Sequence, residues 1–88
     1  MSPVLTPDEI RAAFRQYPLH QYYNEYLEKY LQDMITYNKD PTSEHRSYMA
    51  MSYQIIYSDV KHAWVAGYIS EEDFDTLADI LNAGIISD

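Results

Sequence analysis

The chain has 88 residues, of which 47% are hydrophobic and 23% are charged, and its net charge at pH 7 is −8. This length suits one domain around one hydrophobic core, so we expect residues 1–88 to form a single domain. The chain has no cysteine, which excludes disulfides, thiolate metal sites and a cysteine nucleophile. Its acidity argues against direct binding to nucleic acid, because phosphate backbones attract clustered Lys and Arg.

The sequence predicts neither a membrane span nor secretion. No apolar run approaches the ~18 residues that a spanning helix needs. The first residues lack the basic region and the apolar stretch of a signal peptide. We therefore expect a cytoplasmic protein.

The first predicted helix begins after Thr6. Thr6 suits the N-cap, Pro7 the first helical position, and Glu9 the third position, where it completes a capping box. Phe14 belongs to the short apolar face of this helix, which should end before Pro18.

Two long helices follow, from about residue 19 to 37 and from about 44 to 66. In both, apolar and tyrosine residues recur at spacings of three and four, which is the helical period. Residues 38–43 predict a turn, in which Asp40 or Ser43 caps the second long helix, and Gly67 should end that helix. Because the connection is short, the two helices should lie antiparallel.

The last predicted helix begins after Ser70, with Asp73 closing a second capping box, and Gly84 should end it. Its core face consists of Phe74, Leu77, Ala78 and Leu81. The predicted fold is therefore all-α: a small four-helix domain with a long antiparallel central hairpin (about 19–37 and 44–66), flanked by short N- and C-terminal helices.

The sequence predicts no catalytic residue, cofactor site or metal site. The two glycines stand at predicted helix ends, so no glycine-rich phosphate loop is present. Asp59 and His62 are spaced to share one helix face, but a metal site needs further ligands. A run of tyrosines at the start of the first long helix resembles a platform for stacking bases. Because no basic residues surround this run, we expect these tyrosines at the edge of the core instead.

Acidic residues gather near the C-terminal end of the sequence. From Tyr68 onward there are six acids and no Lys or Arg, and Glu72, Asp75 and Asp79 repeat on one side of the last helix. Such a row can imitate DNA phosphates and bind a basic partner. The alternative is a solvated face, since acids are favoured in the first turn of any helix.

A second apolar stripe runs along the second long helix, away from its main core face. It consists of Tyr48, Met51 and Ile55. Two interpretations stay open: the first helix covers this stripe, or the stripe binds a protein partner or a second copy.

These observations favour a small acidic protein that binds another protein, as an inhibitor or adaptor, and is not an enzyme. In size and charge it resembles anti-CRISPR and anti-restriction inhibitors of phages, including DNA mimics, so the expected partner is a basic nucleic-acid-binding enzyme. The alternatives are a structural helical subunit that forms a homodimer and an immunity protein that neutralises a toxin.

Overall fold

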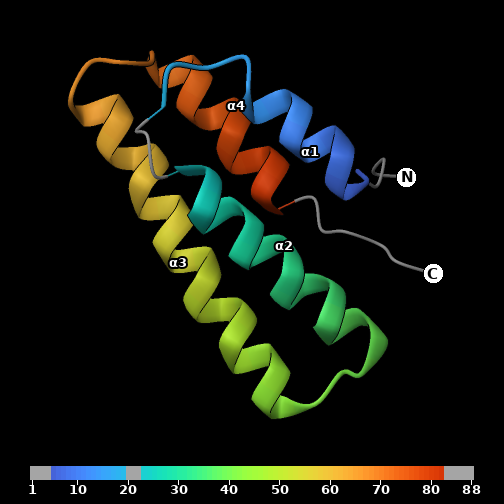
Figure 1. The fold of residues 1–88 in the computed structure, drawn as a ribbon. Coiled ribbons are helices and arrows are strands. Elements are labelled where there is room, and N and C mark those ends of the chain that lie inside the picture. Colours follow the sequence, from blue (N-terminus) through green and yellow to red (C-terminus); the bar gives the residue numbers. More distant parts are fainter. Residues whose placement is uncertain (1–4, 20–22, 83–88) are drawn as a thin grey trace.

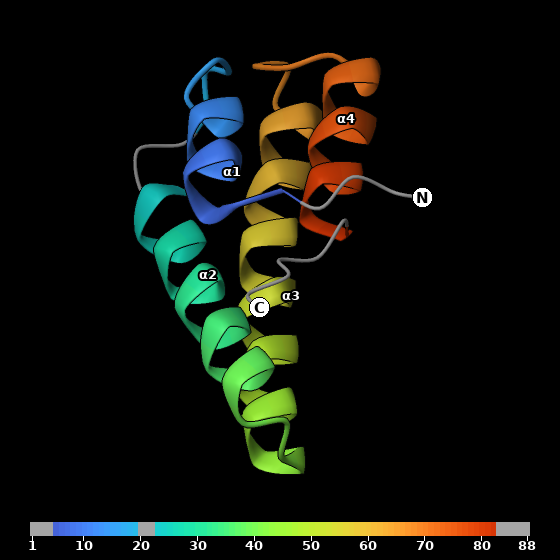
Figure 2. The same ribbon diagram turned by 90° about the vertical axis from the view of Figure 1, so that its right-hand side faces the viewer.

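The computed structural model describes residues 5–19 and 23–82 and confirms the all-α fold. The helices are α1 (Pro7–Phe14), α2 (Tyr23–Lys39), α3 (Ser43–Val65) and α4 (Glu71–Asn82). The long helices α2 and α3 pack antiparallel, as expected, and the short helices flank them (Figure 1). Both short helices lie at the end of the hairpin that is farther from the α2–α3 turn (Figure 2). The turn end of the hairpin therefore consists of α2 and α3 alone.

The boundaries of the hairpin differ slightly from the prediction. Leu19 lies outside any helix, and α2 continues through Asn38 to Lys39, because the Asp40 N–H still bonds to the carbonyl of Thr36. The N-cap of α3 is Thr42, so the expected caps Asp40 and Ser43 are both wrong. Extended backbone at Thr42 lets its hydroxyl accept from the N–H of His45 at 3.1 Å.

The predicted helix ends at Thr6, Gly67 and Ser70 are confirmed. Thr6 and Glu9 form both bonds of a capping box, and the N–H donated by Thr6 lowers the pKa of the Glu9 carboxyl. Ser70 and Asp73 form the same pair of bonds at the start of α4. Gly67 has a φ of +87°, and the N–H groups of Gly67 and Tyr68 close a Schellman motif at the end of α3. The predicted stop at Gly84 lies outside the described residues.

All four helices contribute to one hydrophobic core. The largest fully buried side chains are Ile10, Phe14, Leu27, Leu31, Ile56, Val60, Leu77 and Leu81. Burial of each contributes roughly 1.5–3 kcal/mol relative to exposure.

Tyrosines pack in this core and along its edge, as the sequence predicted for the start of α2. Tyr30 is buried and its hydroxyl donates to the carbonyl of Leu81 at 2.9 Å. Burial, with a smaller effect of Tyr53, raises the pKa of Tyr30 to about 12. Tyr23 stacks on Phe14, with the ring centroids 6.3 Å apart. Tyr22 lies outside the described residues.

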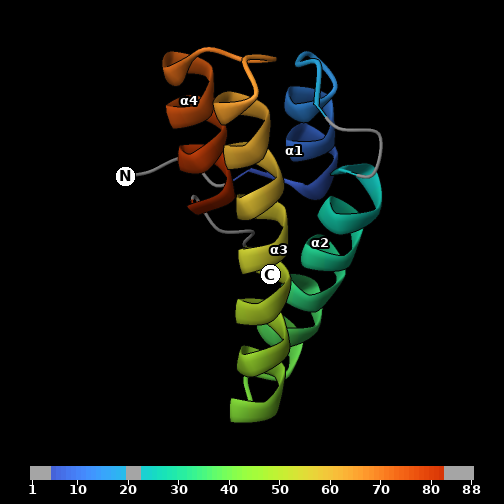
Figure 3. The same cartoon turned by 90° about the vertical axis from the view of Figure 1, so that its left-hand side faces the viewer.

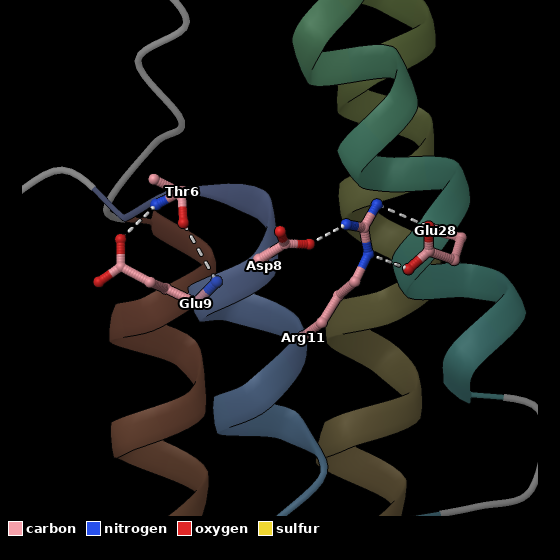
Figure 4. A network of polar contacts seen from close by, with 5 residues as sticks. All are labelled: Thr6, Asp8, Glu9, Arg11 and Glu28. Carbon is pink, nitrogen blue, oxygen red and sulfur yellow. Dashed lines mark hydrogen bonds and ion pairs between the residues drawn. The ribbon is translucent and has the colours of Figure 1, made fainter.

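Polar contacts also connect α2 with α1 and with α3 at the surface of the core. Arg11 of α1 binds Glu28 of α2 through both Nε and Nη2 and also contacts Asp8 (Figure 4). The bond to Glu28, with a smaller contribution from Asp8, raises the pKa of Arg11. In the hairpin, the buried Ser52 donates to Asp33, which also pairs with Lys29 at 3.0 Å. These contacts join α1 and α3 to α2.

Candidate protein-binding surfaces

The three predicted acids of α4 lie on its outer side. We call Glu72, Asp75 and Asp79 the acidic strip, and all three are exposed. At 100° per residue they fall within an arc of roughly 60°. The opposite side of α4 carries Phe74 and Leu81, which are buried and hold the helix in place. The core contacts of α4 thus leave the acidic strip facing solvent.

The other acids at the start of α4 have a local role. Asp73 is half-buried, and its carboxylate accepts a hydrogen bond from the N–H of Ser70 at 3.2 Å. Glu71 stands in the first turn, where the helix dipole favours an acid. Capping therefore accounts for Asp73, and the helix dipole favours both Glu71 and Glu72 in the first turn, but neither effect accounts for Asp75 or Asp79.

The acidic strip has no ion-pair partner within residues 5–19 and 23–82. The salt bridges of this region connect Arg11, Lys29 and His45 with acids of α1, α2 and the α2–α3 turn. The last turn of α4 has no basic residue. Within the described part of the chain, the strip is therefore a negative surface that no ion pair compensates.

The predicted apolar stripe is also exposed. Tyr48, Met51 and Ile55 are 49%, 61% and 49% exposed. The interpretation that the first helix covers them is wrong, because α1 lies at the other end of the hairpin and buries Ile10 and Phe14 in the core there. Figure 3 shows α3 in front of the other helices, with no helix over its outer face.

A shallow groove of about 570 Å³ lies beside this stripe, between α2 and α3. Its lining residues are Tyr26, Met51, Gln54, Ile55, Ser58, Asp59 and His62. Tyr26 comes from α2, and its contribution was not predicted, because periodicity within one helix does not tell which residue of another helix lies beside it. Asp59 and His62 do share the groove, but the described residues contain no group of three His, Cys, Asp or Glu that can hold a metal.

A second hollow, of about 470 Å³, was also not predicted. It lies between α2, α3 and the end of α4, with Met34, Met49 and Leu81 among its apolar residues and Arg46 at its polar side. Its residues come from three helices, so no sequence pattern marks it.

None of the described helices is long and apolar enough to cross a bilayer. Comparison of the chain with protein-family models, with curated proteins and with solved structures finds no match. The acidic strip and the apolar stripe are the two exposed surfaces that the described residues offer to a partner.

Proposed function

We propose that this chain is a non-enzymatic binding protein that occupies a basic surface of another protein with its acidic strip. The observation that carries the proposal is that Glu72, Asp75 and Asp79 are exposed on one side of α4 without an ion-pair partner among the described residues. A folded chain that leaves three aligned carboxylates uncompensated presents a field that attracts clustered cations.

The proposed partner is a protein with a basic groove, such as a nucleic-acid-binding enzyme, and the proposed effect is inhibition or adaptor binding. Neighbouring acids on a helix are roughly 5–6 Å apart. Such a row offers negative charges at short, regular intervals, as a phosphate backbone does. This supports a DNA-mimic inhibitor over a general adaptor. Solubility requires a net charge, but it does not require the charged residues to be aligned on one side of a helix.

The test compares two variants that each remove three negative charges. The strip variant carries Glu72→Gln, Asp75→Asn and Asp79→Asn. The control variant carries Asp8→Asn, Glu25→Gln and Asp40→Asn, which are also exposed but belong to α1, α2 and the α2–α3 turn. Each protein is immobilised, exposed to nuclease-treated lysate and eluted with a salt gradient.

We expect some lysate proteins to be retained by the wild type and by the control variant but not by the strip variant. If each contact contributes about 0.5–1 kcal/mol, the strip variant should bind the purified partner roughly 10- to 100-fold more weakly. The partner should also lose its DNA or RNA when the wild type is added. Equal retention by all three proteins, or retention by none, contradicts the proposal.

A further inference from the structure

The outer face of α3 carries a regular seam that is longer than the apolar stripe. From Glu44 the seam advances by alternating steps of four and three residues to Val65. Its apolar positions are Tyr48, Met51, Ile55 and Val65, the last of which is 73% exposed. Its polar positions are Glu44, Ser58 and His62, which are exposed as well. All positions of the seam therefore face solvent.

This spacing is that of a coiled coil. Alternating steps of three and four keep residues on one side of a helix and match the seam that two packed helices share. At 100° per residue, the whole seam stays within an arc of roughly 100° and extends over roughly 30 Å. The opposite side of α3 is already in use, since Ile56, Val60 and Ala63 are buried in the core. Rotation of α3 cannot bury the seam without exposing this core face, so a helix that covers the seam has to come from another molecule.

The charge pattern of the chain indicates which helix this is. The chain has 20 charged residues, 14 acidic and 6 basic, but none lies between Ser47 and Ser58. Each copy has a net charge of −8, so two copies repel each other. The middle of the seam carries no charge and is therefore the part of α3 where two copies can meet without placing like charges in contact. The acidic strip lies on a different helix, α4.

The seam is also complementary to itself when the two helices run in opposite directions. In a two-fold dimer, if residue i contacts residue j, then j contacts i. A pairing of Met51 with Ile55 of the second copy sets the other positions from Glu44 to His62, and Val65 lies beyond the paired stretch. It places Tyr48 opposite the small Ser58, and Glu44 opposite His62. The imidazole N–H of His62 can donate to the Glu44 carboxylate at both ends of the seam.

The parallel arrangement lacks this complementarity. It places each residue opposite its own copy, so that Glu44 meets Glu44 and Tyr48 meets Tyr48. Like charges in contact destabilise a pair, and two large side chains at one position crowd the seam. We therefore propose that two copies of this chain associate through antiparallel α3 helices along the part of the seam from Glu44 to His62.

The first test measures the oligomeric state over a range of protein concentrations by sedimentation equilibrium. We expect the wild type to pass from monomer to dimer as the concentration rises to the millimolar range. Met51→Glu should weaken the dimer at least ~100-fold, because each dimer would bury two carboxylates. The control is Tyr68→Glu, which changes the charge equally at another exposed residue, 60% accessible and outside the seam.

Met51 is largely exposed, so Met51→Glu should stay folded, and circular dichroism checks this for both variants. If Met51→Glu unfolds, Ile55→Gln replaces it as the seam variant. A wild type that stays monomeric throughout, or a dimer that Met51→Glu and Tyr68→Glu affect equally, overturns the proposal.

The second test determines the direction of the helices and uses the absence of cysteine in the chain. Glu44→Cys and His62→Cys are made as separate variants. Under mild oxidation, a mixture of the two should form a disulfide-linked heterodimer, whereas either variant alone should not. Cross-linking of Glu44→Cys with itself would show a parallel seam, and no cross-linking in the mixture would show that the seam is not the interface. Both results overturn the proposal.

The dimer does not depend on the proposed function. The strip variant leaves the seam unchanged and should dimerise as the wild type does, whereas Met51→Glu should still bind a basic partner as a monomer. Failure of one proposal is thus distinguishable from failure of the other.

Discussion

Thr42 illustrates how a single hydroxyl decides where a helix begins. Asp40, Thr42 and Ser43 are all residue types that cap helices, but it is the hydroxyl of Thr42, on extended backbone, that accepts from the N–H of His45. Ser43 is already the first residue of the helix. Asp40 lies before Pro41, and its backbone carbonyl accepts from the His45 ring and from the Thr42 N–H. The N-cap of α3 is thus determined by backbone geometry and not by residue type.

This assignment predicts different effects of two similar substitutions. Thr42→Ala should lower the free energy of unfolding by about 1 kcal/mol, because the bond to His45 is lost. Ser43→Ala is the control and should change it by less than about 0.5 kcal/mol, since the bond to Ser47 uses the Ser43 backbone carbonyl. Urea titrations of the two variants and the wild type measure both values. An equal loss in both would contradict the assignment.

Of the four helices, α1 is held to the rest of the domain by the smallest set of contacts. Its eight residues place two side chains, Ile10 and Phe14, in the core. Its polar connection to α2 is the two-bond contact of Arg11 with Glu28 (Figure 4). A guanidinium can donate two hydrogen bonds to one carboxylate in this way, whereas a lysine offers a single ammonium. The orientation of α1 on α2 should therefore depend on arginine at this position and not only on positive charge.

Arg11→Lys tests this dependence. We expect a loss of about 0.5–1 kcal/mol in the free energy of unfolding and faster hydrogen exchange of the α1 backbone amides. Arg15→Lys provides the control, because Arg15 is exposed at the end of the same helix. Unchanged exchange rates in Arg11→Lys would mean that burial of Ile10 and Phe14 alone holds α1.

At the scale of the whole molecule, the two proposed surfaces differ in character. The acidic strip concentrates negative charge on α4, and the α3 seam has a middle part without charge. A dimer formed along the seam would therefore present two acidic strips. Binding at the strip would be driven by attraction between opposite charges, whereas dimerisation would proceed against the repulsion between two acidic chains.

This difference predicts opposite effects of salt. Raising the salt concentration to 0.1 M and above shortens the screening length to about 10 Å or less. The complex with a basic partner should then weaken, while the dimer should strengthen as the repulsion is screened. Titrations of the partner and sedimentation equilibrium at several salt concentrations measure the two trends. A dimer that weakens with salt would contradict an apolar seam.

The sequence alone determined the helices and most of their ends. Helical periodicity and capping residues are local signals, since each involves residues within one or two turns, and the structure confirms them at Thr6, Gly67 and Ser70. The exposure of the acidic strip was also predictable, because Phe74, Leu77 and Leu81 mark the opposite side of the same helix as the core side.

Tertiary structure decided what periodicity could not. The sequence left open whether the first helix covers Tyr48, Met51 and Ile55, because an apolar stripe looks the same whether a neighbouring helix covers it or not. Only the packing of α1 at the far end of the hairpin leaves the stripe exposed. The groove beside it required Tyr26 from another helix. Such contacts join residues far apart in the chain, and their positions depend on how the helices share one core.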